Sequence, residues 1–218
     1  MTNNDNKKDI IERIKNQFSS AYLTLISLIQ ASILGFFIYD FSNEVISISS
    51  FTLDSIVIFC EYVAVFLLIV VVWGEYVMGA MVFKWIPGIA DAFIPFLMGI
   101  AQASAIYFVD YELSSQWLFS LASLCALSWW AYRNMYQKSE KHKEDNKLVL
   151  TAINTWKKRN YYITSILAGF LTIVGIVILI YSSKWLNLTI SCLASITTIL
   201  YVFKCHYYWQ TINKALKS

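Results

Sequence analysis

Three acidic side chains lie within or near the ends of long apolar segments, and they are the residues in this chain best suited to chemistry. Glu61 and Glu75 belong to one apolar segment and Asp91 to the next, and we expect no Lys or Arg to be buried with them. A charged side chain at the centre of a bilayer costs about 2.5 to 3.5 kcal/mol on insertion scales, so such residues usually face a bundle interior, a cavity or an ion path. Glu61, Glu75, Asp91 and the buried amide Gln102 are therefore candidates for a pore or ion path.

Glu75 and Asp91 flank the turn at Lys84 almost symmetrically. At the helical rise per residue, each lies about 9 to 14 Å from that turn, so their carboxyls could meet between two antiparallel helices. Such a pair could share a proton or hold a cation. The alternative is structural, with Glu75 at the membrane interface and Asp91 capping a helix that contains Pro95.

Glu61 is expected roughly 9 Å below the outer end of its segment. In a symmetric oligomer, one such carboxyl per subunit would make a ring that attracts cations. The alternative is a glutamate paired with a neighbouring hydroxyl or amide. Gln30 and Gln102 are predicted to hydrogen-bond between helices, which would make them packing residues.

Membrane-spanning helices must position these side chains. Of the 218 residues, 58% are hydrophobic and 14% are charged, and the mean hydropathy is +0.55, whereas soluble domains contain about 25% charged residues. A span needs roughly 20 apolar residues, and six segments meet this requirement. The sequence predicts an all-α, polytopic membrane protein. Its predicted spans are 18–39, 55–82, 87–109, 117–136, 161–181 and 185–203.

The basic residues predict the orientation of these spans. Of the 17 Lys and Arg residues, four precede the first span, one follows the second, and three follow the sixth. Eight more lie in 133–159, from the end of the fourth span to the start of the fifth. These sixteen share one side if all six spans exist, and only Lys184 lies on the other. Because Lys and Arg gather on the cytoplasmic side, both termini are predicted to be cytoplasmic, in a bacterial inner membrane.

The basic segment after the fourth span is the largest polar element. Within it Val149, Ile153 and Trp156 recur at helical spacing, so a short amphipathic helix could lie on the inner leaflet or against a cytosolic protein. Anionic inner-leaflet lipids are the expected partner. The alternative is a solvated loop that only follows the charge rule. The candidate lipid- or partner-binding residues are Arg133, Lys138, Lys141, Lys143, Lys147, Lys157, Lys158 and Arg159.

The same segment divides the chain into successive units, and aromatic residues near the span ends mark their boundaries as interface anchors. The units are an amphipathic cytoplasmic tail (1–17), a four-helix transmembrane unit (18–136), the basic cytoplasmic loop (137–160), a transmembrane hairpin (161–206) and a cytoplasmic tail (207–218). The anchors are Tyr39, Trp117, Trp129, Trp130, Trp185, Tyr207, Tyr208 and Trp209.

No motif indicates an enzyme, a cofactor or a metal site. The two histidines lack the spacing of a zinc site, and no phosphate-binding loop or nucleophile elbow is present. A net charge of +3 without a clustered basic footprint does not favour nucleic-acid binding. The four cysteines, Cys60, Cys125, Cys192 and Cys205, fall within or beside spans, so no disulfide is predicted.

Three functions are compatible with this pattern. The first is a homo-oligomeric channel or pore whose acidic residues attract cations. The second is a non-conducting sensor or scaffold that recruits a cytosolic protein through its basic loop. A proton-coupled transporter comes third, because Pro87 and Pro95 of the third span have no counterparts in the sixth, as an inverted repeat would require.

Overall fold

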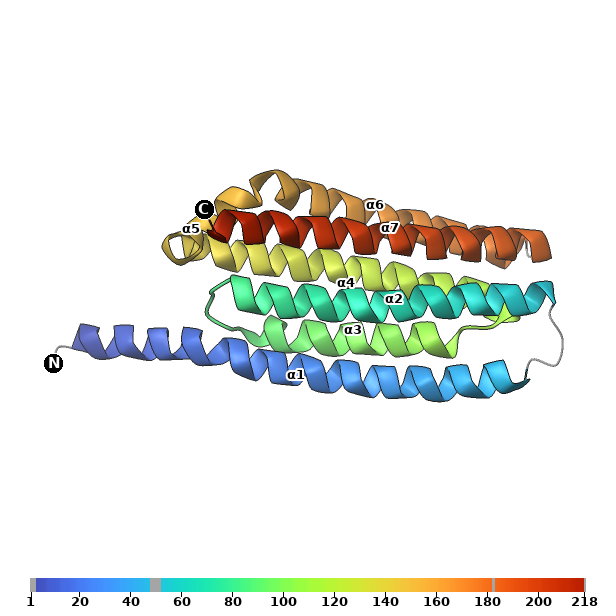
Figure 1. Ribbon diagram of the computed structural model, residues 1–218, viewed down its shortest axis with the longest axis horizontal. Helices are drawn as coiled ribbons and strands as arrows, with labels where there is room; N and C mark the ends of the chain where they lie inside the picture. Colours follow the sequence, from blue (N-terminus) through green and yellow to red (C-terminus); the bar gives the residue numbers. More distant parts are fainter. Residues whose placement is uncertain (1–2, 48–51, 182, 218) are drawn as a thin grey trace.

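The computed structural model describes residues 3–47, 52–181 and 183–217, and within these ranges the chain is helical and contains no strand (Figure 1). Five of its seven α-helices, α1, α2, α3, α6 and α7, are long and apolar enough to cross a membrane. This part of the chain therefore has the character of an integral membrane protein. The helices are α1 (Asn3–Ser47), α2 (Leu53–Val82), α3 (Ile89–Tyr107), α4 (Ser114–Lys141), α5 (Lys143–Ala152), α6 (Asn154–Ile180) and α7 (Lys184–Lys217), with a 3₁₀ turn at Tyr111–Leu113.

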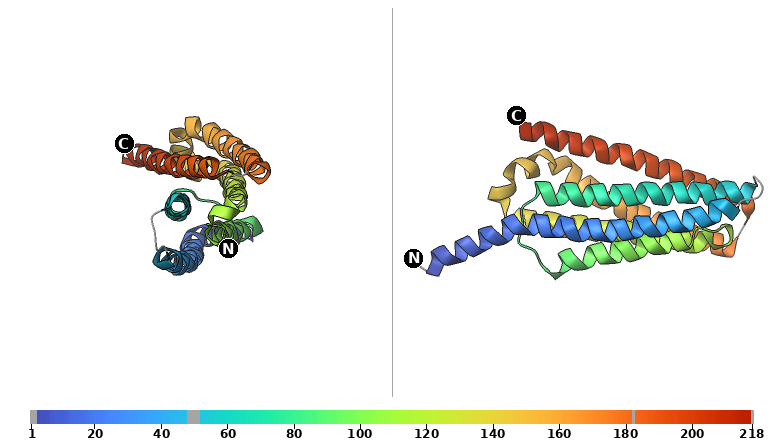
Figure 2. Two further views of the ribbon diagram at one scale, coloured as in Figure 1. Left: turned by 90° about the vertical axis from the view of Figure 1, so that its right-hand side faces the viewer. Right: turned by 60° about the horizontal axis from the view of Figure 1, so that its bottom comes forward.

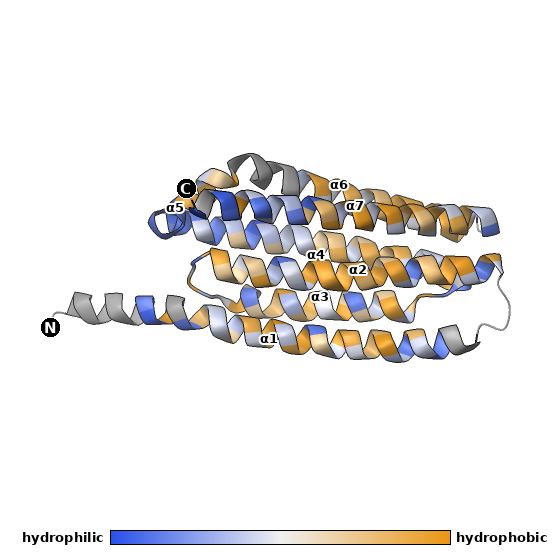
Figure 3. Ribbon diagram, in the orientation of Figure 1, coloured by the Kyte–Doolittle hydropathy of each residue, from blue (hydrophilic) through white to orange (hydrophobic). Residues whose placement is uncertain are grey.

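Helix α4 contains the predicted span 117–136, but it is less apolar than the other long helices. It packs between α3 and α6, and its N-terminal half buries Trp117, Leu118 and Leu121. A helix shielded by its neighbours does not need an apolar surface all round. Figure 3 shows the hydrophilic residues gathered at one end of the bundle, around α5 and the adjoining ends of α4 and α7.

Local signals explain where α2 and α3 begin and end. Thr52 caps α2, since its hydroxyl accepts the Ser55 N–H at 3.2 Å. Pro87 disfavours a helical conformation in the residue before it, and the chain between Val82 and Ile89 is not helical. The third helix thus begins two residues later than the predicted span.

The long helices form a ring with one open seam. On one side α1 packs on α2 and α2 on α7, and on the other side α1 packs on α3, α3 on α4 and α4 on α6. Helices α6 and α7 follow one another in the chain but make few contacts, and Figure 2 shows them diverging. The two sides of the ring enclose a space that opens between α6 and α7.

The predicted basic loop 137–160 is mostly helical. α4 continues to Lys141, α5 follows, and α6 begins at Asn154. The predicted amphipathic helix is interrupted, because Val149 lies in α5, Ile153 caps the end of α5 and Trp156 belongs to α6. Val149 and Ile153 are buried against the bundle. Asn146 fixes α5 in place, because its side chain accepts the Lys84 N–H at 2.8 Å and donates to the Lys84 carbonyl at 2.7 Å.

Candidate functional site

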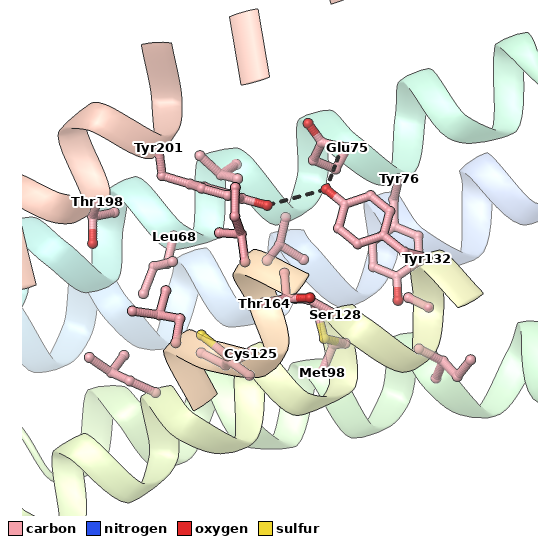
Figure 4. Close-up of a pocket in the computed structure, with 18 of the residues that line it drawn as sticks. Leu68, Glu75, Tyr76, Met98, Cys125, Ser128, Tyr132, Thr164, Thr198 and Tyr201 are labelled. Carbon is pink, nitrogen blue, oxygen red and sulfur yellow. Dashed lines mark hydrogen bonds between the residues drawn. The ribbon is translucent and has the colours of Figure 1, made fainter. Parts of the chain in front are cut away.

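Glu75 lies in a polar network beside a cavity. From α4 the Tyr132 hydroxyl donates to Glu75 Oε2 at 2.8 Å, and from α7 the indole N–H of Trp209 donates to Oε1 at 3.0 Å. The Tyr132 hydroxyl also lies 3.2 Å from that of Tyr201 on α7 (Figure 4). Both carboxylate oxygens are therefore satisfied by the protein itself.

The cavity has a volume of about 240 Å³ and lies between the two sides of the ring. Its wall is largely apolar, with Leu68 from α2, Met98 from α3 and Leu171 from α6 among the residues that form it. Hydroxyl groups of Thr164, Ser128 and Thr198 are interspersed (Figure 4). A mainly apolar cavity with a few placed polar groups is the usual form of a small-molecule site.

The cavity reaches the outer surface of the bundle at the seam between α6 and α7. Phe170 of α6 and Leu193 of α7 line the cavity, yet they are 60% and 56% exposed. Residues that are both lining and exposed mark the mouth. A molecule dissolved in the bilayer could enter here without crossing water.

At the opposite side, two hydrogen-bond donors line the cavity without a protein partner. The Tyr76 hydroxyl and the indole N–H of Trp85 are both shielded, and neither has a hydrogen-bond partner among the described residues. Buried donors are nearly always satisfied in folded proteins. An acceptor atom of a bound molecule would satisfy them.

Asp91 is held by the protein in a way that corrects one expectation. Lys138 of α4 forms an ion pair with its Oδ2, and Asn134 donates to Oδ1 at 2.8 Å. The expectation that no cation accompanies the acidic residues is wrong here, because α4 continues beyond the predicted span and carries Lys138 back to the bundle. The Gly88 N–H donates to Asp91 Oδ2 at 2.6 Å, so Asp91 takes part in capping α3 as its third residue, while Gly88 is the N-cap.

Glu75 and Asp91 do not form the predicted carboxyl pair. No hydrogen bond or ion pair joins them within the part of the chain that the structure describes. Both carboxyls line the same cavity, as do their partners Tyr132 and Asn134, which are two residues apart on α4. The two carboxyls are satisfied separately.

Glu61 is enclosed within the single chain. Its side chain is 0% exposed, and its Oε1 accepts the hydroxyls of Ser191 on α7 at 2.8 Å and Ser114 on α4 at 3.3 Å. Pairing with a neighbouring hydroxyl was the structural alternative, and the geometry agrees with it. Gln102 accepts a hydrogen bond from the Gln30 amide at 3.0 Å, which confirms the interhelical amide contact.

The basic candidates divide into three groups. Lys138 is engaged by Asp91, and the exposed Arg133 lies over the ring of Trp129 at 5.3 Å. Lys141, Lys143 and Lys147 are exposed near α5. The backbone of residues 157–159 belongs to α6, but the side chains of Lys157, Lys158 and Arg159 are outside the described part of the structure.

Two predicted interface anchors are core residues instead. Trp117 is 0% exposed and Tyr208 is 2% exposed, because each packs between helices. Other anchors, such as Tyr39 and Trp185, are exposed near helix ends. Among the described residues, no three His, Cys, Asp or Glu side chains converge as a metal site would require. Comparisons of the chain with protein-family models, with curated proteins and with solved structures found no match.

Proposed function

We propose that this protein binds an amphiphilic molecule from the bilayer in the cavity between α2 and α7 on one side and α3, α4 and α6 on the other. The observation that carries the proposal is the cavity itself, which opens at an apolar mouth between α6 and α7 and contains unpaired donors at its far side. The apolar body of the ligand would lie along the cavity. Its polar head would accept hydrogen bonds from Tyr76 and Trp85.

We also propose that six helices span the membrane. Five of them are apolar enough to be recognised by composition, and α4 is the sixth. α4 is shielded by α3 and α6, so it can cross the membrane with polar groups on its inner half. Six spans place sixteen of the 17 Lys and Arg residues on one side, which supports cytoplasmic termini. A bacterial inner membrane is the location we propose.

The three earlier hypotheses stay predictions, and the geometry supports ligand binding better than a channel. Glu61 and Gln102 are hydrogen-bonded within one chain and do not line the cavity, and Asp91 is paired with Lys138. Of the four path candidates, only Glu75 is therefore next to the cavity without a cation. A ligand site with a mouth in the bilayer is also compatible with a transporter. Docking of α5 on the bundle leaves its exposed lysines available to a scaffold function.

Photolabelling of the nanodisc-held protein tests this proposal. The probe is a long-chain fatty acid that carries a diazirine, because its carboxylate can accept hydrogen bonds and its tail is apolar. Thr197 lines the cavity, so Thr197→Trp should fill part of the cavity with a large side chain. The matched control is Ile196→Trp, which changes an exposed residue that does not line the cavity. We expect adducts on cavity residues of α6 and α7, reduced about tenfold by Thr197→Trp, as for a loss of about 1.4 kcal/mol.

Two results would contradict the proposal. Adducts distributed equally over exposed apolar residues such as Leu179 and Phe203, and unchanged by Thr197→Trp, would mean that the probe reports lipid contact alone. Cation conductance by the same preparation in planar bilayers, with no cavity adducts, would favour the channel instead.

A further inference from the structure

Cys60 and Cys192 bring two thiols together across the interface of α2 and α7. Their Sγ atoms lie 3.5 Å apart, although 132 residues separate them in the chain. Both side chains are partly exposed, and both are free thiols. This contact lies about 10 Å from the start of each helix. On α7, Cys192 is next to Leu193, which lines the mouth of the cavity.

The backbones at this point are close and held in register. The Ser195 hydroxyl of α7 donates to the Cys60 carbonyl at 2.5 Å, so a side chain as short as serine spans the distance to the backbone of α2. One residue away, Ser191 donates to Glu61 at 2.8 Å. These two contacts flank the thiols and fix the relative position of the helices.

A disulfide could form here by a small movement. The S–S bond is about 2.05 Å long, so the two sulfur atoms must approach by about 1.5 Å, which side-chain rotation can supply where the backbones are already close. Cys125 on α4 and Cys205 on α7 differ, because neither has a second thiol at hydrogen-bonding distance among the described residues. They serve as internal controls.

We propose that Cys60 and Cys192 are a redox-active dithiol that closes to a disulfide between α2 and α7. In this step both S–H bonds break and one S–S bond forms, and two protons and two electrons pass to the oxidant. The oxidant must reach thiols within the apolar helices, so its class is a membrane-permeant acceptor of two electrons and two protons. A quinone, which leaves as the quinol, has these properties.

Thiol counting after mild oxidation tests the proposal on the full-length protein in nanodiscs. The probe is diamide, a membrane-permeant azo compound that becomes a hydrazine when it takes up the two hydrogens. After oxidation the protein is denatured, alkylated with a maleimide polymer and resolved by size. We expect two of the four thiols to be protected, protection to be reversed by dithiothreitol, and a linked peptide pair containing residues 60 and 192 to appear by mass spectrometry.

Cysteine variants distinguish a disulfide between Cys60 and Cys192 from general oxidation of the thiols. Cys60→Ser and Cys192→Ser should each abolish protection, whereas the double change Cys125→Ser with Cys205→Ser should retain it. Serine is close in size to cysteine, and size-exclusion behaviour checks that each variant is folded. Four reactive thiols after diamide, or protection caused only by dimers that separate on reduction, would overturn the proposal.

Discussion

Glu61 and Glu75 lie about four turns apart on α2, and both reach residues of α7, yet they occupy different surroundings. Glu61 is 0% exposed in a closely packed region, where two serine hydroxyls donate to one of its oxygens. Glu75 lines the cavity and is bonded by aromatic side chains, Tyr132 and Trp209. Residue type and helix are the same, but only one carboxyl adjoins space that a ligand could fill.

This difference shows that an acidic residue within a span does not by itself identify a pathway. A carboxyl can be retained inside a bundle when neighbouring hydroxyls bond to it, since a polar group without partners in an apolar environment costs several kcal/mol. At Glu61 the hydroxyls bond to Oε1, while Oε2 has no hydrogen-bond partner among the described residues. The distinguishing features at Glu75 are the adjacent cavity and the unpaired donors on Tyr76 and Trp85. We therefore expect substitutions at Glu61 to affect stability and those near Glu75 to affect binding.

The largest effect on stability is expected for Glu61→Ala. The change removes the acceptor of the Ser114 and Ser191 hydroxyls and leaves a void in a packed region, so the free energy of unfolding should fall by about 2 to 4 kcal/mol. Glu61→Gln retains an acceptor oxygen and a similar volume, so it should cost about 1 kcal/mol or less. Unfolding equilibria in mild detergent measure the stability of both variants. Equal losses of unfolding free energy would mean that the hydroxyl contacts to Glu61 do not stabilise the protein.

An intermediate effect, on binding alone, is expected for Tyr76→Phe. The hydroxyl has no protein partner, so its removal should leave stability unchanged within about 0.5 kcal/mol and weaken binding of the fatty-acid probe about fivefold to tenfold. Tyr132→Phe is the matched change, because it breaks the bond to Glu75 and should lower stability by about 1 kcal/mol. Competition photolabelling and unfolding measurements on both variants give the comparison. If Tyr76→Phe lowered stability and left probe binding normal, the Tyr76 hydroxyl would have a structural role and not a role in binding.

The smallest effect on the bundle is expected from charge reversal at its basic end. Lys141, Lys143 and Lys147 are exposed, and exposed charges contribute about 1 kcal/mol or less each to stability. Changing all three to Glu should leave probe labelling and unfolding nearly unchanged, and should reduce association with vesicles that contain anionic lipid, where each basic residue contributes about 1 kcal/mol. Lost labelling would mean that α5 is coupled to the cavity.

The helical membrane class could be predicted from the sequence because long apolar segments permit few alternatives. Each of the six predicted spans overlaps one long helix, although the spans 87–109 and 161–181 extend beyond α3 and α6. The predicted ends of the spans were less accurate, since hydropathy indicates where a helix leaves the hydrocarbon core of the membrane and not where the helix ends. α4 continues to Lys141 and α7 to Lys217, well past the predicted boundaries.

The candidate site was only partly predictable, because its contacts join residues far apart in the chain. Glu75 was identified, but its partner Trp209 was interpreted as an interface anchor. The pairing of Asp91 with Lys138 was missed because the predicted fourth span ended at residue 136, which assigned Lys138 to a loop. One usable signal was present: Asn134 and Lys138 are four residues apart and share a helix face.

The distance along the chain between α2 and α7 has a consequence for assembly. α7 supplies Ser191 to Glu61 and Trp209 to Glu75, so both glutamates of α2 receive partners from residues 130 and 134 positions later in the chain. Until α7 has been synthesised and inserted, α2 carries two glutamates that lack these partners. We expect chains truncated before α7 to be degraded by membrane proteases, so that insertion of α7 acts as a checkpoint for assembly.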